Sequence, residues 1–169
     1  MAVKGSVPGE ALYAIRKIAH QGEAFFVSEQ EKPAFQLKLA NDRLEDLAKA
    51  SARNLAPTIN EFQANMAEAV KTLSKINASS SSPVVIQKIV AETKKLEENK
   101  QKVESLGMVI GEEETAELET ILGKMVEGSI KDLEGMTLSE EKAEILNQIK
   151  ELFEAKKYSE ALEVYLLNQ

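Results

Sequence analysis

The sequence predicts an all-α protein, namely an antiparallel bundle of six or seven helices that ends in a helical hairpin. Three observations predict this class. Apolar residues recur at spacings of three, four and seven along most of the 169 residues. No segment has the alternating β-branched residues of a strand. Pro, Gly and Ser residues fall between the periodic segments, where helices are expected to begin and end.

Three helices are expected in the N-terminal half. The first runs from Pro8 to Val27, and its apolar stripe is expected to face the core; the stripe comprises Leu12, Ile15, Ile18, Ala19, Phe25 and Phe26. The second begins near Ser28 and Glu31, which have the spacing of a capping box, and buries Leu37, Ala40, Leu44 and Leu47. The third covers about residues 56–77, with Phe62 and Met66 on its stripe.

The fourth and fifth helices follow a serine-rich loop. Pro83 suits the first turn of the fourth helix, and Gly107 ends it. Lys100 interrupts the apolar stripe of this helix, which predicts a position on the outside of the bundle. The fifth helix begins around Gly111, is favoured by three glutamates in its first turn, and stops at Gly135.

Two short antiparallel helices are predicted to complete the chain. Thr137 and Glu140 have capping-box spacing, and the hinge between the two helices is expected at residues 157–159. Residues 1–135 are predicted to form the main bundle, and residues 136–169 a hairpin that packs on it within one compact domain.

Composition excludes several kinds of protein. The net charge is −7, and basic residues are interleaved with acidic ones, so no nucleic-acid partner is expected. No apolar run is long enough to be a transmembrane segment. The first residues, MAVKGSV, lack the apolar core of a signal peptide, so an export signal is expected to lie outside this sequence.

Catalytic motifs are missing, and we expect a protein that is not an enzyme. One histidine, His20, cannot supply a His-Glu-x-x-His zinc motif, and no Gly-x-Ser-x-Gly turn or phosphate-binding loop is present. The absence of cysteine removes thiolate chemistry. The GEEET segment at Gly111 lacks the alternating ligands of a calcium loop, and its glutamates are explained by the helix dipole. No cofactor or metal is therefore expected, and His20 is predicted to be a half-exposed surface residue.

Two segments are candidates for interaction. Residues around Tyr158 and Tyr165 have the packing pattern of a tetratricopeptide hairpin, including Ala155, Ala161 and Leu162. A single such hairpin does not make an array, and a hairpin that caps the end of the bundle is the alternative. Asn77-Ala78-Ser79 fits a glycosylation acceptor or, alternatively, a plain loop.

Two segments carry a resemblance to a known family. The segments are PGEALYAIRKIAH and, about twenty residues later, LKLANDRLEDLAK. Together they resemble a bacterial helical domain of unknown function found in exported or membrane-anchored proteins. The residues that carry the resemblance lie between Pro8 and Ile76; they are Pro8, Gly9, Leu12, Tyr13, Arg16, Lys17, Leu39, Ala40, Arg43, Leu44 and Glu45. The sequence departs from the family pattern at His20 and around Pro33.

The resemblance implies an extracytoplasmic helical protein, in the periplasm or at the cell surface, and supplies no reaction. We expect it to act through a protein partner or self-assembly, as a subunit of a cell-envelope assembly or a periplasmic sensor module. Tyr13 and Arg43 are expected to orient the first two helices against each other. The alternative is a bundle that binds a lipid or metal, and a shallow apolar pocket lined by Phe25, Phe26, Phe62 and Met66 would favour it.

Overall fold

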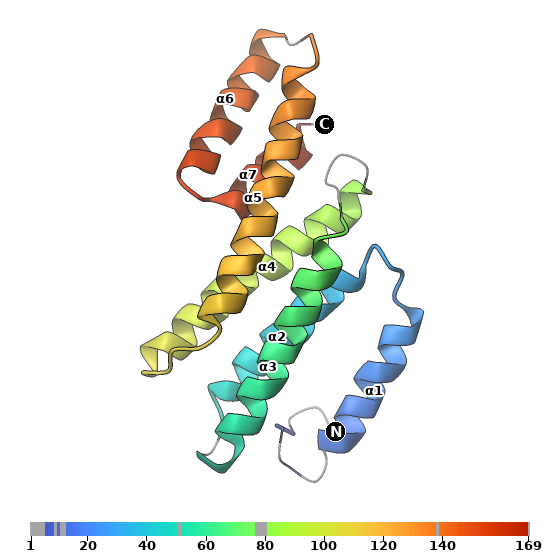
Figure 1. Ribbon diagram of the computed structural model, residues 1–169, viewed down its shortest axis with the longest axis vertical. Coiled ribbons are helices and arrows are strands. Elements are labelled where there is room, and N and C mark those ends of the chain that lie inside the picture. Colours follow the sequence, from blue (N-terminus) through green and yellow to red (C-terminus); the bar gives the residue numbers. More distant parts are fainter. Residues whose placement is uncertain are drawn as a thin grey trace.

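The computed structural model describes residues 6–8, 10, 13–50, 52–76, 81–137 and 139–168. Within these ranges it contains seven helices and no strand, which confirms the predicted all-α class (Figure 1). The helices are α1 (Tyr13–Phe26), α2 (Lys32–Leu47), α3 (Ala52–Leu73), α4 (Pro83–Ser105), α5 (Glu112–Glu134), α6 (Glu140–Glu154) and α7 (Tyr158–Leu167).

The core forms between α2, α3, α4 and α5. α2 packs against α3 and α4, and α3 packs against α5. The predicted stripes of α2 and α3 lie inside this core, where Leu37, Leu44, Phe62 and Met66 are almost completely buried. Apolar burial of this kind is the main force that holds such helices together.

The predicted outer position of α4 is wrong. This helix contributes eight buried residues and packs against both α2 and α7. Lys100 does not prevent this, because its Nζ lies 3.2 Å from the Thr115 hydroxyl at the start of α5 and 3.8 Å from a Glu104 carboxylate oxygen. A single lysine at the edge of a buried stripe keeps its charge near polar groups while its aliphatic stem packs.

A buried polar network fixes how α2 and α4 align. The amide nitrogen of Asn41 donates to the backbone carbonyl of Glu92 and to its carboxylate, each at 2.9 Å. Asn99 donates in turn to the side-chain oxygen of Asn41 at 3.2 Å. A shift of one helix along the other would leave these buried amides without partners, which is costly.

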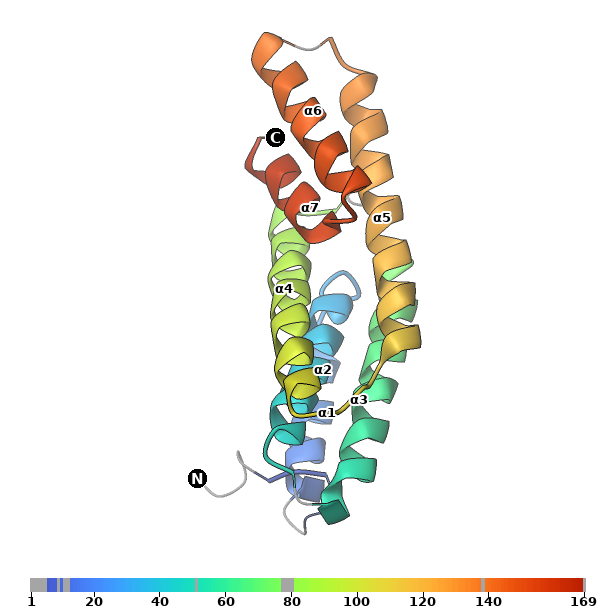
Figure 2. The same ribbon diagram turned by 90° about the vertical axis from the view of Figure 1, so that its left-hand side faces the viewer.

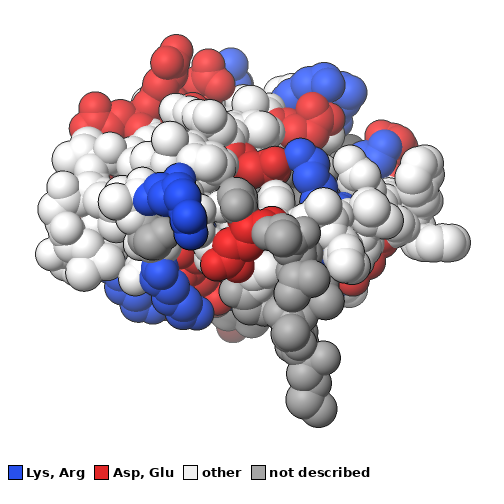
Figure 3. Space-filling model, turned by 90° about the horizontal axis from the view of Figure 1, so that it is seen from below, with Lys and Arg blue, Asp and Glu red and all other residues white. Residues whose placement is uncertain are grey.

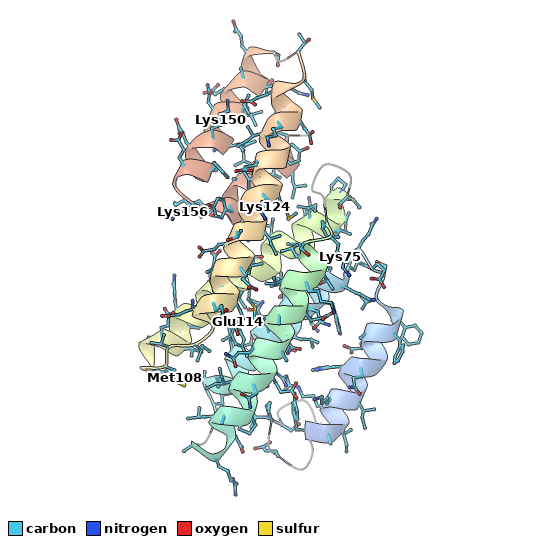
Figure 4. The ribbon with its side chains drawn as sticks, viewed as in Figure 1. Lys75, Met108, Glu114, Lys124, Lys150 and Lys156 are labelled. Atoms are coloured by element: carbon cyan, nitrogen blue, oxygen red, sulfur yellow. The ribbon has the colours of Figure 1, made fainter. Side chains whose placement is uncertain are left out.

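The hairpin of α6 and α7 covers one end of the molecule (Figure 2). α6 packs on α5, and α7 packs on both α4 and α5. The turn between α6 and α7 contains Lys156, labelled in Figure 4, with a φ of 58°. Ala161, Leu162 and Tyr165 are buried as the hairpin pattern predicts, whereas Ala155 is exposed, because it lies in that turn.

Helix ends differ from the predictions at several points. α3 begins at Ala52, four residues earlier than expected, so Pro57 lies inside the helix. The Ser28 hydroxyl donates to Glu31 at 3.0 Å, and neither side chain caps α2. Ser139 caps α6 in place of Thr137, by accepting from the Lys142 amide. The candidate glycosylation site at 77–79 lies outside the described residues, as do Gly9 and Leu12.

Candidate functional site

Helix α1 is attached to the rest of the molecule by polar side chains. It alone among the described helices shares no extended backbone contact with another, and none of its described residues is buried. In Figure 1 it stands apart from the remaining helices, on the side of α3 away from α5. Something other than close apolar packing must therefore position this helix.

The inner face of α1 carries the polar side chains. Tyr13, Arg16, Lys17 and His20 recur at intervals of three and four, so they share one side of the helix. Three of them contact partners on α2 and α3. We name these contacts the α1 anchor, which consists of Tyr13, Arg16 and Lys17 of α1, Arg43 and Asp46 of α2, and Glu61 of α3.

Arg43 is the centre of the α1 anchor. It is only 1% exposed, although arginine is almost never buried without a partner. Its Nη1 donates to the Tyr13 hydroxyl at 2.6 Å, and its guanidinium carbon lies 5.1 Å from the centre of the Tyr13 ring. Its Nη2 lies 3.1 Å from a carboxylate oxygen of Asp46. One side chain of α2 thus connects α1 to the buried acid.

Arg16 reaches the same carboxylate from α1. Its Nη1 donates to both oxygens of Asp46, at 3.1 and 2.9 Å, and to the backbone carbonyl of Ser6 at 2.8 Å. Its Nη2 lies 3.9 Å from Asp42. Two guanidinium groups on different helices therefore share one carboxylate, and the segment before α1 is connected to the same group.

Lys17 extends the α1 anchor to α3. Its Nζ donates to Glu61 at 2.7 Å, although half of the lysine side chain remains exposed. The three cations of the α1 anchor are matched by Asp42, Asp46 and Glu61. A cluster with balanced charge has little net attraction for an external anion.

Burial shifts the ionisation of three groups here. It raises the pKa of the Tyr13 hydroxyl above 10.0, and it raises the pKa of Asp46 above 3.8 against the opposing effect of Arg43 and Arg16. Burial, assisted by the same two arginines, lowers the pKa of His20 below 6.5. His20 is half-exposed, as the sequence predicts.

The outer face of α1 is apolar. Ile15 and Ile18 are 53% and 67% exposed, and Phe25 and Phe26 are 88% and 92% exposed. Gly22 lies between the two pairs on the same side of the helix, and no heavy atom lies within 4 Å of where its Cβ would be. We call these five residues, Ile15, Ile18, Gly22, Phe25 and Phe26, the outer face.

The prediction that this stripe packs into the core is wrong. Periodicity indicates which residues share a side of a helix, but it does not indicate which side meets the neighbours. On α1 one side is continuously polar and the other continuously apolar, and the polar side contacts the charged groups of opposite sign on α2 and α3. Phe25, Phe26, Phe62 and Met66 do not line one pocket, because the last two lie in the core and the first two on the outer face.

The α1 anchor and the outer face lie in a region with known relatives. A family model described as Domain of unknown function (DUF5667) matches residues 5–112. The chain belongs to this family. The match extends the resemblance beyond Ile76, through α4 to the first residue of α5. No curated protein and no solved structure matched the chain.

The other predicted residues lie away from the α1 anchor. Within the DUF5667 region, Glu45 pairs with Lys95 of α4 at 2.9 Å, and this contact lowers the pKa of Glu45. Beyond the DUF5667 region, the Tyr158 ring lies 5.6 Å from that of Phe153, and Tyr165 belongs to the core. These three residues join helices, and none contacts α1.

Sequence reasoning missed Asp46 and Glu61. Asp46 follows Arg43 by three residues, a spacing that usually indicates a pair of charges on a solvated helix face. Only the structure shows that α1 covers this pair. Glu61 is one of many acidic residues, and no local pattern distinguishes it.

The arrangement is suited to holding a helix. The α1 anchor contains no serine or cysteine nucleophile beside a base, and its carboxylates are occupied by arginine and lysine. Within the described ranges, no three His, Asp or Glu side chains are grouped so that they could hold a metal ion. At the end of the molecule seen in Figure 3, cationic and anionic side chains are interspersed. None of the described helices has the length and hydropathy needed to cross a bilayer.

Proposed function

We propose that this protein is a non-enzymatic, extracytoplasmic bacterial helical domain that acts through contacts with other proteins. It would serve as a structural or assembly subunit of the cell envelope, or as a periplasmic sensor module. The observation that carries the proposal is the outer face of α1, which is apolar, exposed and held away from the core.

The size of the outer face supports a role in contact. Isolated apolar residues on a surface are normal, whereas a contiguous apolar patch of several hundred Å² is often functional. The α1 anchor also supports this role, since it holds the helix with polar contacts and leaves the apolar side free. The two basic residues of α1, Arg16 and Lys17, are turned inward and occupied, whereas Glu23, next to Gly22, is exposed.

The extracytoplasmic position rests on the resemblance to exported or membrane-anchored proteins. Its motif residues make physical sense as a unit: Tyr13, Arg16, Lys17 and Arg43 converge in the α1 anchor, while Leu39, Ala40 and Leu44 are buried in α2. The motif therefore specifies how α1 docks on α2. Such a device orients a surface and performs no reaction, which is the reason for proposing a protein without enzymatic activity.

Photo-crosslinking in cells of the source organism tests the contact. A photoreactive phenylalanine analogue replaces Phe26 on the outer face or, as a control, Leu167, which is 74% exposed on α7. We expect a protein adduct from position 26 and none from position 167. Adducts only with lipid at position 26, or no adduct there, would contradict the proposal.

The location is tested by labelling. The chain has no cysteine, so a Gln30→Cys variant carries one thiol, at an exposed turn before α2. In intact cells that express the full-length gene product, a membrane-impermeant maleimide should label this thiol. Labelling that requires permeabilised cells would place the protein in the cytoplasm.

A further inference from the structure

We propose that the outer face of α1 binds a second copy of this chain, so that two α1 helices cross at Gly22 in a two-fold symmetric dimer. This inference rests on the proposed function, because it names the partner of the same surface. The occupant is inferred from the shape, the area and the charge of the outer face.

The shape of the outer face is complementary to itself. Ile15 and Ile18 project on one side of Gly22, and Phe25 and Phe26 project on the other. Glycine lowers helix stability relative to alanine, and nothing within the molecule requires it here, since the space around its Cβ position is empty. A missing side chain between two pairs of large ones leaves a hollow that lets a second helix approach closely. In a two-fold pair each copy offers the same patch, so the projections of one helix lie beside the hollow of the other.

The area of the outer face is close to what a specific dimer needs. At roughly 200 Å² for a phenylalanine, and somewhat less for an isoleucine, the exposed fractions give about 550 Å² per copy. Two copies would therefore bury at most about 1,100 Å², just below the 1,200 Å² at which stable interfaces begin. We therefore expect a reversible dimer of modest affinity.

The charges favour a second copy over a membrane surface. A helix that lies on a membrane usually presents Lys and Arg beside its apolar face, where they meet anionic headgroups. Here Arg16 and Lys17 are turned away and occupied by Asp46 and Glu61. The outer face itself carries no charge, and the repulsion between two copies comes from the exposed Glu23 beside Gly22 and from the net charge of −7 on each chain. This repulsion is screened by salt, so dimerisation should strengthen with ionic strength.

Sedimentation velocity on the purified protein tests the inference. Between about 5 and 500 µM protein the weight-average mass should rise from the 18.6 kDa of one chain toward twice that value. The rise should be larger at about 500 mM salt than at about 20 mM salt. A Phe25→Ser/Phe26→Ser variant should weaken the dimer at least about tenfold, because large aromatic residues dominate such interfaces. Both side chains are almost fully exposed in one copy, so the variant should fold normally.

Two further variants make the test specific. Leu167→Ser removes an exposed apolar residue of α7 and should leave the dimer unchanged. Gly22→Ala should keep or raise the melting temperature, since alanine favours helix, yet it should weaken the dimer by filling the hollow. A mass that stays at one chain throughout, or equal weakening by Leu167→Ser, would overturn the inference. So would binding to anionic phospholipid vesicles by a protein that remains monomeric.

The outcomes separate this inference from the proposed function. If crosslinks at position 26 join a different protein and the purified chain is monomeric, the second copy is refuted and the proposed function stands. If crosslinks at position 26 join only lipid, both are refuted.

Discussion

Replacing Arg43 tests whether the α1 anchor holds α1 in place. Arg43→Ala removes the 2.6 Å bond to Tyr13 and the 3.1 Å contact with Asp46. A hydrogen bond that involves a charged group contributes about 1.5–3 kcal/mol, and cation–π stacking on Tyr13 adds about 0.5–1 kcal/mol. The full cost of about 3–5 kcal/mol for breaking a buried ion pair does not apply, because Asp46 keeps Arg16.

One effect of Arg43→Ala would stabilise the protein. Arg43 Nε is buried and has no hydrogen-bond acceptor among the described residues, so the wild-type protein already carries a desolvation cost that alanine removes. The net loss is therefore about 2–3 kcal/mol of unfolding free energy. At about 2–4 °C per kcal/mol for a domain of this size, the melting temperature should fall by about 4–12 °C.

Thermal unfolding followed by circular dichroism at 222 nm measures this change. Arg43→Lys keeps the charge but lacks the planar guanidinium that contacts both Tyr13 and Asp46, so it should lose a substantial part of the same stability. Lys95→Ala is the matched control, because it breaks an ion pair in which both side chains are more than 40% exposed, and such pairs contribute about 0–1 kcal/mol.

Amide hydrogen exchange adds the location of the effect. If Arg43 holds α1, the Ala variant should speed exchange in α1 more than in α3, because a locally attached helix opens before the core does. A fall in melting temperature no larger than that of Lys95→Ala would refute the reasoning. Unchanged stability together with lost partner binding would also refute it, because Arg43 would then contact the partner and would not hold α1.

Three other changes should have measurable effects. Gly111→Ala should lower the unfolding free energy by about 2–4 kcal/mol in urea unfolding, because the φ of Gly111 is +65° and the new Cβ would lie 2.5 Å from the Phe62 ring. Gly107→Ala is the control: its φ is +82°, but no atom lies near the new Cβ, so it should cost only about 1–2 kcal/mol. The pKa of His20, the one histidine of the chain, should lie below 6.5 when its ring protons are followed by NMR, because burial lowers it and Arg16 and Arg43 add to the effect; a pKa at or above 6.5 would show that the ring is not buried beside these arginines. The unfolding free energy of the wild-type protein, relative to that of Asp46→Asn, should increase as the pH falls from the raised pKa of Asp46 in the folded state toward its unfolded value of 3.8. The reason is that the folded state binds this proton at a higher pH than the unfolded state does. A decrease over this range would contradict burial of the carboxylate.

Much of the fold could be predicted because it follows from local pattern. The stripes of α2 and α3, the start at Pro83 and the stop at Gly107 depend on residues close together in sequence. The start of α3 could not be placed, because Pro57 is tolerated inside the helix at the loss of one backbone bond. The position of α4 was missed for a similar reason, since Lys100 weakens the pattern without preventing burial.

The candidate site could be predicted only in part. Tyr13, Arg16, Lys17 and Arg43 were identified by a motif that joins two segments of the chain, and the structure brings these four together. Their roles depend on Asp46 and Glu61, whose spacing resembles that of any solvated charge. The contacts are made between three helices, and the residue pattern of one helix does not indicate which charged residue of another helix will lie opposite it.

The orientation of α1 is decided by α2. Turning the outer face inward would remove its apolar surface from water, and this gain alone would favour the opposite orientation. The same turn would place apolar side chains over Arg43 and Asp46 and would leave these buried charges without Tyr13 and Arg16. Arg43 and Asp46 would then keep only each other, at 3.1 Å, and the buried hydrogen-bonding groups that lose their partners on α1 would raise the free energy, as would the lost bonds of Arg16 and Lys17. The buried pair on α2 therefore selects the polar side of α1 as the inner one, and the apolar surface that this choice leaves exposed is available to drive association.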